Sequence, residues 1–344
     1  MAGFEECQPG SSCGTRIAAG VLAAVLLVVG SQACKRSPPK ATKSEQQAED
    51  LKAVKLPGYN LHDNLSLSGA LVHMMRDGLV AGAGVLVADD TVLAPGLTCD
   101  GGQLSVIFQS QGNEAATGSD VIKRQSRSIK SCAAVRSLVT EKLKASESNP
   151  PRLVTSLAAT FDRLKAFELA IVKFEGGLPT GDRVKWKPVA SHDPAITLAS
   201  TTSEWRSWEA LTGKFIGLAG FSRAEETKKG SFVRRIWLPV RIPSGARSDD
   251  PFDFSAETWI VDSDRSPIRY PEEWLKGPQQ VMFPPMIFSG VARFPNVTAD
   301  AEIQSPQPNL LAFVHGWDEI KEAPVATRFA PRCLDAAPIL ALLK

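Results

Sequence analysis

The chain has 344 residues, of which 43% are hydrophobic and 22% charged, enough for one two-part domain or two small ones with a sizeable core. Its 39 basic and 37 acidic residues leave a net charge of +2. Charges so nearly balanced do not point to nucleic acid as a partner. The four histidines share no metal-binding spacing, and no two cysteines are spaced as C-x-x-C. We therefore expect no metal and no cofactor.

The N-terminal segment carries an export signal. Residues 17–30 are uncharged and apolar, which is short for a bilayer span and typical of the apolar part of a signal peptide. Ala33-Cys34 follow and resemble a bacterial lipobox, although Ser31 stands where Leu is usual. Cleavage before Cys34 would leave it free for lipidation. The alternatives are plain secretion after cleavage behind Ala33, or a retained anchor helix. We assign residues 1–34 to the signal peptide and lipobox.

Residues 35–60 are rich in Lys, Ser, Gln and Glu up to Lys55, cannot bury a core, and are expected to form a flexible tether. The expected location is the cell envelope, as a periplasm-facing lipoprotein or a secreted protein, with the membrane contacted through lipid or the N-terminal anchor. Export also bears on Cys99, Cys132 and Cys333, among which at most one disulfide can form. The sequence does not say which two pair.

From about Leu65 onward, short apolar runs alternate with turn residues, which favours a sandwich or barrel. Arg76-Asp77-Gly78 and Asp89-Asp90 each separate two such runs and predict hairpins. The predicted strands are 70–75, 80–87, 91–93, 104–108, 169–174, 214–221, 232–242 and 310–314. The predicted core includes Leu86, Leu93, Ile107, Ile171, Val172, Ile216 and Val314.

Two segments have helical composition instead, Ser131–Leu143 and Arg152–Phe167. In the second, apolar residues recur at spacings of four, four and three from Leu153 to Leu164, so they share one helix face. We expect a helical insertion at about 131–167. Leu334–Leu343 is also helix-like, with Pro338 in its first turn or at a kink.

Four segments resemble trypsin-like serine proteases, in the family's order. Gly82–Leu93 resembles the hairpin that leads to the catalytic histidine, and Glu168–Lys173 resembles the strand that begins with the catalytic acid. Gly217–Arg223 and Leu310–Trp317 resemble two strands of the second barrel, the latter the strand that binds substrate backbone. The resemblance implies an all-β fold, a trypsin-like double β-barrel with the helical insertion in the first barrel and a C-terminal helix. It puts the first barrel at 61–195 and the second at 196–344.

The catalytic positions of that family are degenerate here. Leu97 and Thr98 precede Cys99 where the family has its histidine, and Glu168 takes the place of the acid. The site comparable to the family's nucleophile is Ser289-Gly290, which lacks the preceding acid and the second following glycine, and this argues against an oxyanion hole. A serine hydroxyl without a base is a weak nucleophile. His315 borders the substrate strand, where it is either structural or an unorthodox base.

The sequence therefore favours a pseudoprotease at the envelope that binds a protein or peptide. The alternative is an active, divergent serine endopeptidase that uses Ser289 with Glu168 and an unidentified base. A third hypothesis is a β-rich lipoprotein with a structural role.

Overall fold

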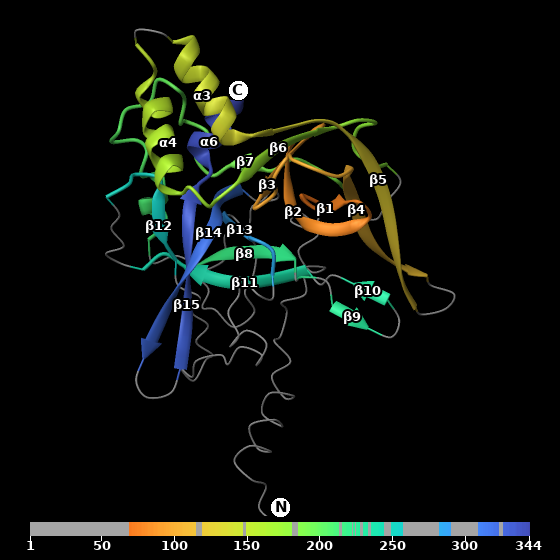
Figure 1. Cartoon of the computed structure of the whole chain (residues 1–344). Helices are drawn as coiled ribbons and strands as arrows, with labels where there is room; N and C mark the ends of the chain where they lie inside the picture. Colours follow the sequence, from red (N-terminus) through yellow and green to blue (C-terminus); the bar gives the residue numbers. More distant parts are fainter. Residues whose placement is uncertain are drawn as a thin grey trace, which may run out of the picture. The chain divides into compact units, whose positions relative to one another are not determined.

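The computed structural model describes residues 69–114, 119–146, 149–180, 185–212, 215–221, 223, 225–227, 230–232, 235–243, 249–256, 282–289, 309–322 and 326–344 (Figure 1). The predicted signal, Cys34 and the tether lie outside these residues. The first half is a closed barrel in the order β1-β2-β3-β6-β5-β4. Its strands are β1 (Leu71–Arg76), β2 (Leu79–Ala88), β3 (Thr91–Pro95), β4 (Leu104–Glu114), β5 (Ser119–Ala134) and β6 (Leu169–Phe174).

Both predicted hairpins are confirmed. Asp77 and Gly78 join β1 to β2 and have φ of 50° and 81°. Asp and Gly are the residue types that adopt such left-handed backbone at low cost, and they match the twist of a two-residue hairpin. The second hairpin turns at Asp89-Asp90 between β2 and β3. The predicted strand 169–174 is confirmed as β6.

The helical insertion lies between β5 and β6, as predicted, and consists of α3 (Val135–Ala145) and α4 (Arg152–Arg163). Leu153, Leu157 and Phe161 are buried on one face of α4. The predicted start at Ser131 is wrong by four residues, because β5 continues to Ala134 and pairs with β6. Pairing in the closed barrel overrides the helical composition of those four residues.

The second half is built around a seven-stranded sheet in the order β11-β8-β13-β14-β15-β12, with β7 paired to β14. Among the described residues its two ends, β11 and β12, are not paired with each other. Its elements are β7 (Ala190–Ser191), β8 (Phe215–Phe221), β11 (Arg235–Arg241), β12 (Asp253–Ser255), β13 (Met286–Ser289), β14 (Asn309–Glu322) and β15 (Ala326–Asp335). Short η2 (Ser207–Leu211), the separate pair β9 (Glu225–Thr227) and β10 (Gly230–Phe232), and helix α6 (Ala337–Leu343) complete it.

The predicted all-β class is confirmed: the described chain is mostly β, with a closed six-stranded barrel, a second sheet and a C-terminal helix. Of the strand expected at 232–242, Arg235–Arg241 form β11 and Phe232 is the last residue of β10. β7 already pairs with β14, so the chain reaches the second sheet before residue 195. The domain boundaries themselves stay a prediction.

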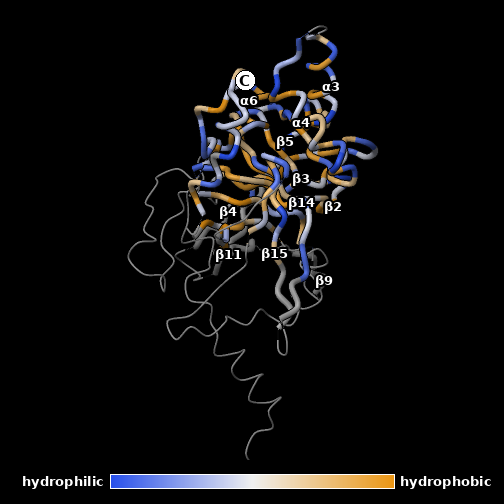
Figure 2. The backbone as a smooth tube through the Cα atoms, turned by 90° about the vertical axis from the view of Figure 1, so that its left-hand side faces the viewer, coloured by the Kyte–Doolittle hydropathy of each residue, from blue (hydrophilic) through white to orange (hydrophobic). Residues whose placement is uncertain are grey.

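Three apolar clusters form the core. One fills the barrel and another lies on one face of the second sheet. The third joins the two halves, because it contains Leu93 of the barrel, Phe161 of the insertion, and Phe313 and Leu334 of the second sheet. Figure 2 shows the hydrophobic stretches gathered in the middle of the described chain and hydrophilic ones toward its outer loops. Of the predicted core residues, Leu86, Leu93, Val172, Ile216 and Val314 are buried, whereas Ile107 and Ile171 are partly exposed.

The cysteine pairing that the sequence left open is Cys99 with Cys132, and Cys333 is free and buried. The bridge ties the loop after β3 to β5. None of the helices in the described segments has both the length and the apolar character needed to cross a bilayer.

Candidate functional site at the junction of the barrel and the second sheet

The backbone of Gly96 lies directly opposite Glu168. Pro95 pairs with Leu169 at the end of β3, and one residue further the Gly96 N–H donates to the Glu168 carbonyl oxygen at 2.7 Å. Gly96 has φ of +74°, a conformation that glycine adopts at no steric cost. The residue that stands across from the predicted acid position therefore has no side chain.

Leu97 and Thr98, the residues at the predicted histidine position, are held by the barrel. Leu97 is 3% exposed and belongs to the barrel core. Thr98 is bound by the guanidinium of Arg76, which donates to both its carbonyl and its hydroxyl oxygen. With Cys99 in the disulfide, this loop is fixed at three successive residues.

A turn of the second half packs against Gly96. A Cβ atom added to Gly96 would lie 2.7 Å from Cγ of Pro284. The next residue, Pro285, accepts a hydrogen bond from the Val314 N–H at 2.9 Å, which fixes the turn to β14. We call Gly96, Glu168, Pro284, Pro285 and His315 the junction site.

The chemistry of this turn does not suit acyl transfer. Residues 282–286 read Met-Phe-Pro-Pro-Met, so no hydroxyl or thiol is available as a nucleophile. Pro284 and Pro285 have no backbone N–H, and the Phe283 N–H is used by the Phe221 carbonyl at 3.0 Å. An oxyanion hole needs free N–H donors, and none of these three residues offers one.

Ser289, the residue comparable to the family's nucleophile, lies at the last residue of β13, at the end of the strand opposite to the proline turn. It is 7% exposed and pairs with Asn309 of β14. Gly290 lies outside the described residues. Within the described chain, the contacts of Gly96 lead to Glu168 and Pro284, and not to Ser289.

His315 joins the junction site to a charged cluster on the second sheet. Its Nε2 donates to Oδ1 of Asp253 at 3.0 Å, and Arg332 donates to Oδ2 at 3.3 Å. The imidazole also lies against the ring of Phe167, at 5.9 Å between centroids, immediately before Glu168 in the chain. Burial by itself would raise the pKa of Asp253, but the hydrogen bond and charge of His315 and the charge of Arg332 outweigh it and lower that pKa. Asp253 is therefore ionised and orients the imidazole.

The other described histidines lie elsewhere. His73 is buried, with its ring 3.9 Å from that of Phe221. Nδ1 of His192 lies 3.8 Å from Oδ1 of the fully buried Asp335. Burial lowers the pKa of His192 to about 4, although the charge of Asp193 opposes this, so His192 is neutral at pH 7. His62 lies outside the described residues.

No group of three or more His, Cys, Asp or Glu that could hold a metal ion occurs in the described part of the chain. The sequence interpretation missed Asp253, Arg332 and the proline turn. Asp253 and Arg332 carry no local signal, because only the pairing of β12 with β15 brings them together. The Pro284-Pro285 pair was visible as a segment without N–H donors, directly before an apolar run.

No protein-family model and no curated protein matches the sequence. Among solved structures, the Drosophila Grass clip serine protease of the Toll pathway matches with a TM-score of 0.44 at 11% identity, covering 83% of this chain and 70% of that one. A scabies mite inactivated protease paralogue, S-D1, matches with a TM-score of 0.36 at 11% identity, covering 79% and 87%. A mutant of human heparin binding protein matches with a TM-score of 0.37 at 10% identity, covering 78% and 87%.

Proposed function

We propose that this protein binds an extended peptide or protein segment at the cell envelope and does not cleave it. The observation that carries the proposal is the contact between Gly96 and Pro284. At the predicted histidine position this chain has Leu97 and Thr98, and the turn that packs against the neighbouring Gly96 contains no hydroxyl, no thiol and, at its two prolines, no N–H donor. Binding energy remains available to such a site, but Gly96 and the proline turn offer a chemical step neither a base nor a nucleophile.

Among the described strands, one edge of β14 has no partner beyond Val314, and we propose this edge as the surface for a peptide. β13 pairs with β14 only from Asn309 to Phe313, and Pro285 takes the next N–H, that of Val314. Beyond this point, Gly316–Asp318 pair only with β15 among the described strands. An unpaired strand edge binds extended peptides through main-chain hydrogen bonds. The edge begins beside His315, at the junction site.

The envelope location is proposed on the sequence alone. The apolar run 17–30 and Ala33-Cys34 support export and lipidation at Cys34, followed by the tether at 35–60. A lipid anchor and a tether would present the folded part to partners close to the membrane.

Hydrogen–deuterium exchange tests the binding proposal. The probe is a set of peptides enriched on the full-length protein from a randomised decapeptide pool. On binding, amides of Gly316–Asp318 should exchange more slowly, while those of Asn309–Phe313, already paired with β13, serve as the internal control. Mass spectrometry of the same sample should recover the peptides intact.

The alternatives give different results in this experiment. Cleaved peptides would favour the active protease that uses Ser289 with Glu168, and the oriented imidazole of His315 would then be the base to examine. Absence of any enriched peptide would favour a structural role. If peptide binding slowed amide exchange only on another surface, the proposal that the β14 edge binds the peptide would be wrong.

A further inference from the structure

We infer that Asp250 is a positioning residue, which fixes the turn before β12 to helix α4 and so sets the place of Asp253 against His315. The helical insertion is thereby coupled to the junction site. The part of this inference that concerns peptide affinity rests on the proposed function, and the part that concerns His315 does not.

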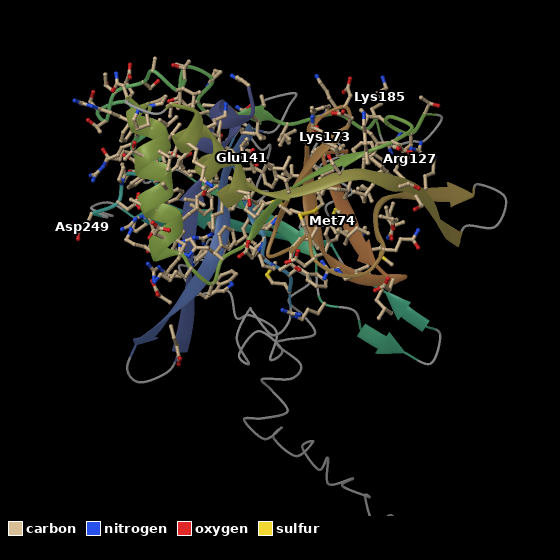
Figure 3. All side chains as sticks on the ribbon, turned by 45° about the horizontal axis from the view of Figure 1, so that its top comes forward. Met74, Arg127, Glu141, Lys173, Lys185 and Asp249 are labelled. Carbon is tan, nitrogen blue, oxygen red and sulfur yellow. A yellow bond between two sulfur atoms is a disulfide. The ribbon has the colours of Figure 1, made fainter. Side chains whose placement is uncertain are left out.

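Asp250 is a buried carboxylate with partners on helix α4. Its side chain is 2% exposed, Oδ2 accepts a hydrogen bond from the Thr160 hydroxyl at 2.6 Å, and Arg163 forms an ion pair with the same oxygen. A buried charge is retained only with such partners, because its desolvation is otherwise too costly. Figure 1 shows β12 beside α4, and Figure 3 places Asp249, the preceding residue, on the same side as that helix. The insertion therefore holds this point of the second half.

The same carboxylate shapes the turn that leads into β12. Oδ1 of Asp250 accepts the Phe252 N–H at 2.7 Å, a local turn in which an Asp side chain binds the backbone two residues on. Pro251 stands between them with a restricted φ, and its carbonyl oxygen accepts a hydrogen bond from Nε1 of Trp208 at 3.1 Å. The Phe252 carbonyl in turn accepts the Asp335 N–H at 2.7 Å. Three hydrogen bonds, from the Phe252 N–H, Trp208 Nε1 and the Asp335 N–H, thus hold the turn in place.

Asp253 is the next residue and carries the contact to the junction site. Its two carboxylate oxygens bind His315 and Arg332, so a small displacement of the turn changes both hydrogen bonds. His315 lies at the irregular point between Val314 and Gly316, where the open edge of β14 begins. A displacement of α4 can therefore reach the edge of β14 through the turn at Asp250 and the hydrogen bond between Asp253 and His315.

The experiment uses full-length protein with ¹³Cε1-labelled histidine. The chain has only four histidines, and His315→Gln assigns the His315 signal. Thr160→Val removes the hydroxyl that binds Asp250 with little change of shape. Thr155→Val is the matched control, because among the described residues that exposed hydroxyl donates to the carbonyl of Pro151, the residue directly before α4. We expect Thr160→Val to move the His315 signal and to weaken binding of the enriched peptides about fivefold or more, and Thr155→Val to do neither.

Asp250→Asn is a second variant for the case that Thr160→Val does not fold, since it keeps an acceptor for the Phe252 N–H and loses the charge that pairs with Arg163. A folded variant of either kind with the wild-type His315 signal overturns the inference. A moved signal with unchanged peptide affinity overturns the coupling to binding. Where wild-type protein binds no peptide, the proposed function fails and the His315 signal still decides the role of Asp250.

Discussion

At the scale of single residues, His192 gives the protein a defined response to acid. Its pKa of about 4 in the folded protein lies below the ordinary 6.5, because burial disfavours the imidazolium. Between these values the unfolded chain binds more protons, so stability from neutral His192 is full above about pH 6.5 and is lost as the pH falls toward 4. The neighbouring Asp335 acts in the opposite sense, since burial raises its pKa.

Between pH 6.5 and 4, we therefore expect the free energy of unfolding of His192→Gln to fall by about 3 kcal/mol less than that of wild type. Urea unfolding at a series of pH values measures the difference between the two proteins. If the free energies of unfolding of wild type and variant changed in parallel between pH 6.5 and 4, His192 would not be buried in its neutral form.

Restoring a histidine should not restore activity. Leu97→His puts a polar ring into the barrel core, where Leu97 is 3% exposed, and should destabilise the fold. Thr98→His loses the hydroxyl that accepts a hydrogen bond from Arg76. The effects of mutations on catalytic rate are far from additive for residues that act as one catalytic unit. Assay of both variants for peptide cleavage checks this, and measurable turnover in either one would show that the missing histidine is the sole defect.

At the scale of elements, the β2–β3 hairpin depends on one glycine. A Cβ atom at Gly84 would collide with Cγ1 of Val92, whereas at Gly82 the nearest atom, Cβ of Met74, is 4.0 Å away. Gly84→Ala should therefore destabilise the barrel by about 1–3 kcal/mol, as overpacking of a core does, and Gly82→Ala should be close to neutral. Thermal unfolding compares the two variants, and equal melting temperatures would contradict the packing described for β2.

Elements that carry a local signal could be predicted from the sequence. The two hairpins follow from Asp77-Gly78 and Asp89-Asp90, and α4 follows from the spacing of its apolar residues. Ser131–Ala134 could not be placed, because their strand conformation comes from pairing with β6 and not from local preference. The Pro284-Pro285 pair was visible, but its contact with Gly96 and the Asp253–His315 pair could not be found for the same reason: both depend on strands that are distant in sequence.

At the scale of the whole molecule, membrane association is proposed to depend on one residue outside the described structure. Cys34→Ala should abolish labelling with a radioactive fatty acid and release the protein from membranes, since it removes the atom that would carry the lipid. Fractionation of cells that express each form measures the release. Membrane retention of Cys34→Ala without lipid label would point to a retained anchor helix at residues 17–30 instead.

The most direct test of the account is labelling of the full-length protein with a fluorophosphonate probe, which reacts only with an activated serine. We predict no labelling, because Leu97 and Thr98 occupy the predicted histidine position and the turn that packs against Gly96 contains no hydroxyl or thiol. Ser289 has no described contact with Glu168, and the proline turn offers no oxyanion donors. Labelling of wild-type protein that disappears in Ser289→Ala would contradict the account and identify the protein as an active serine hydrolase.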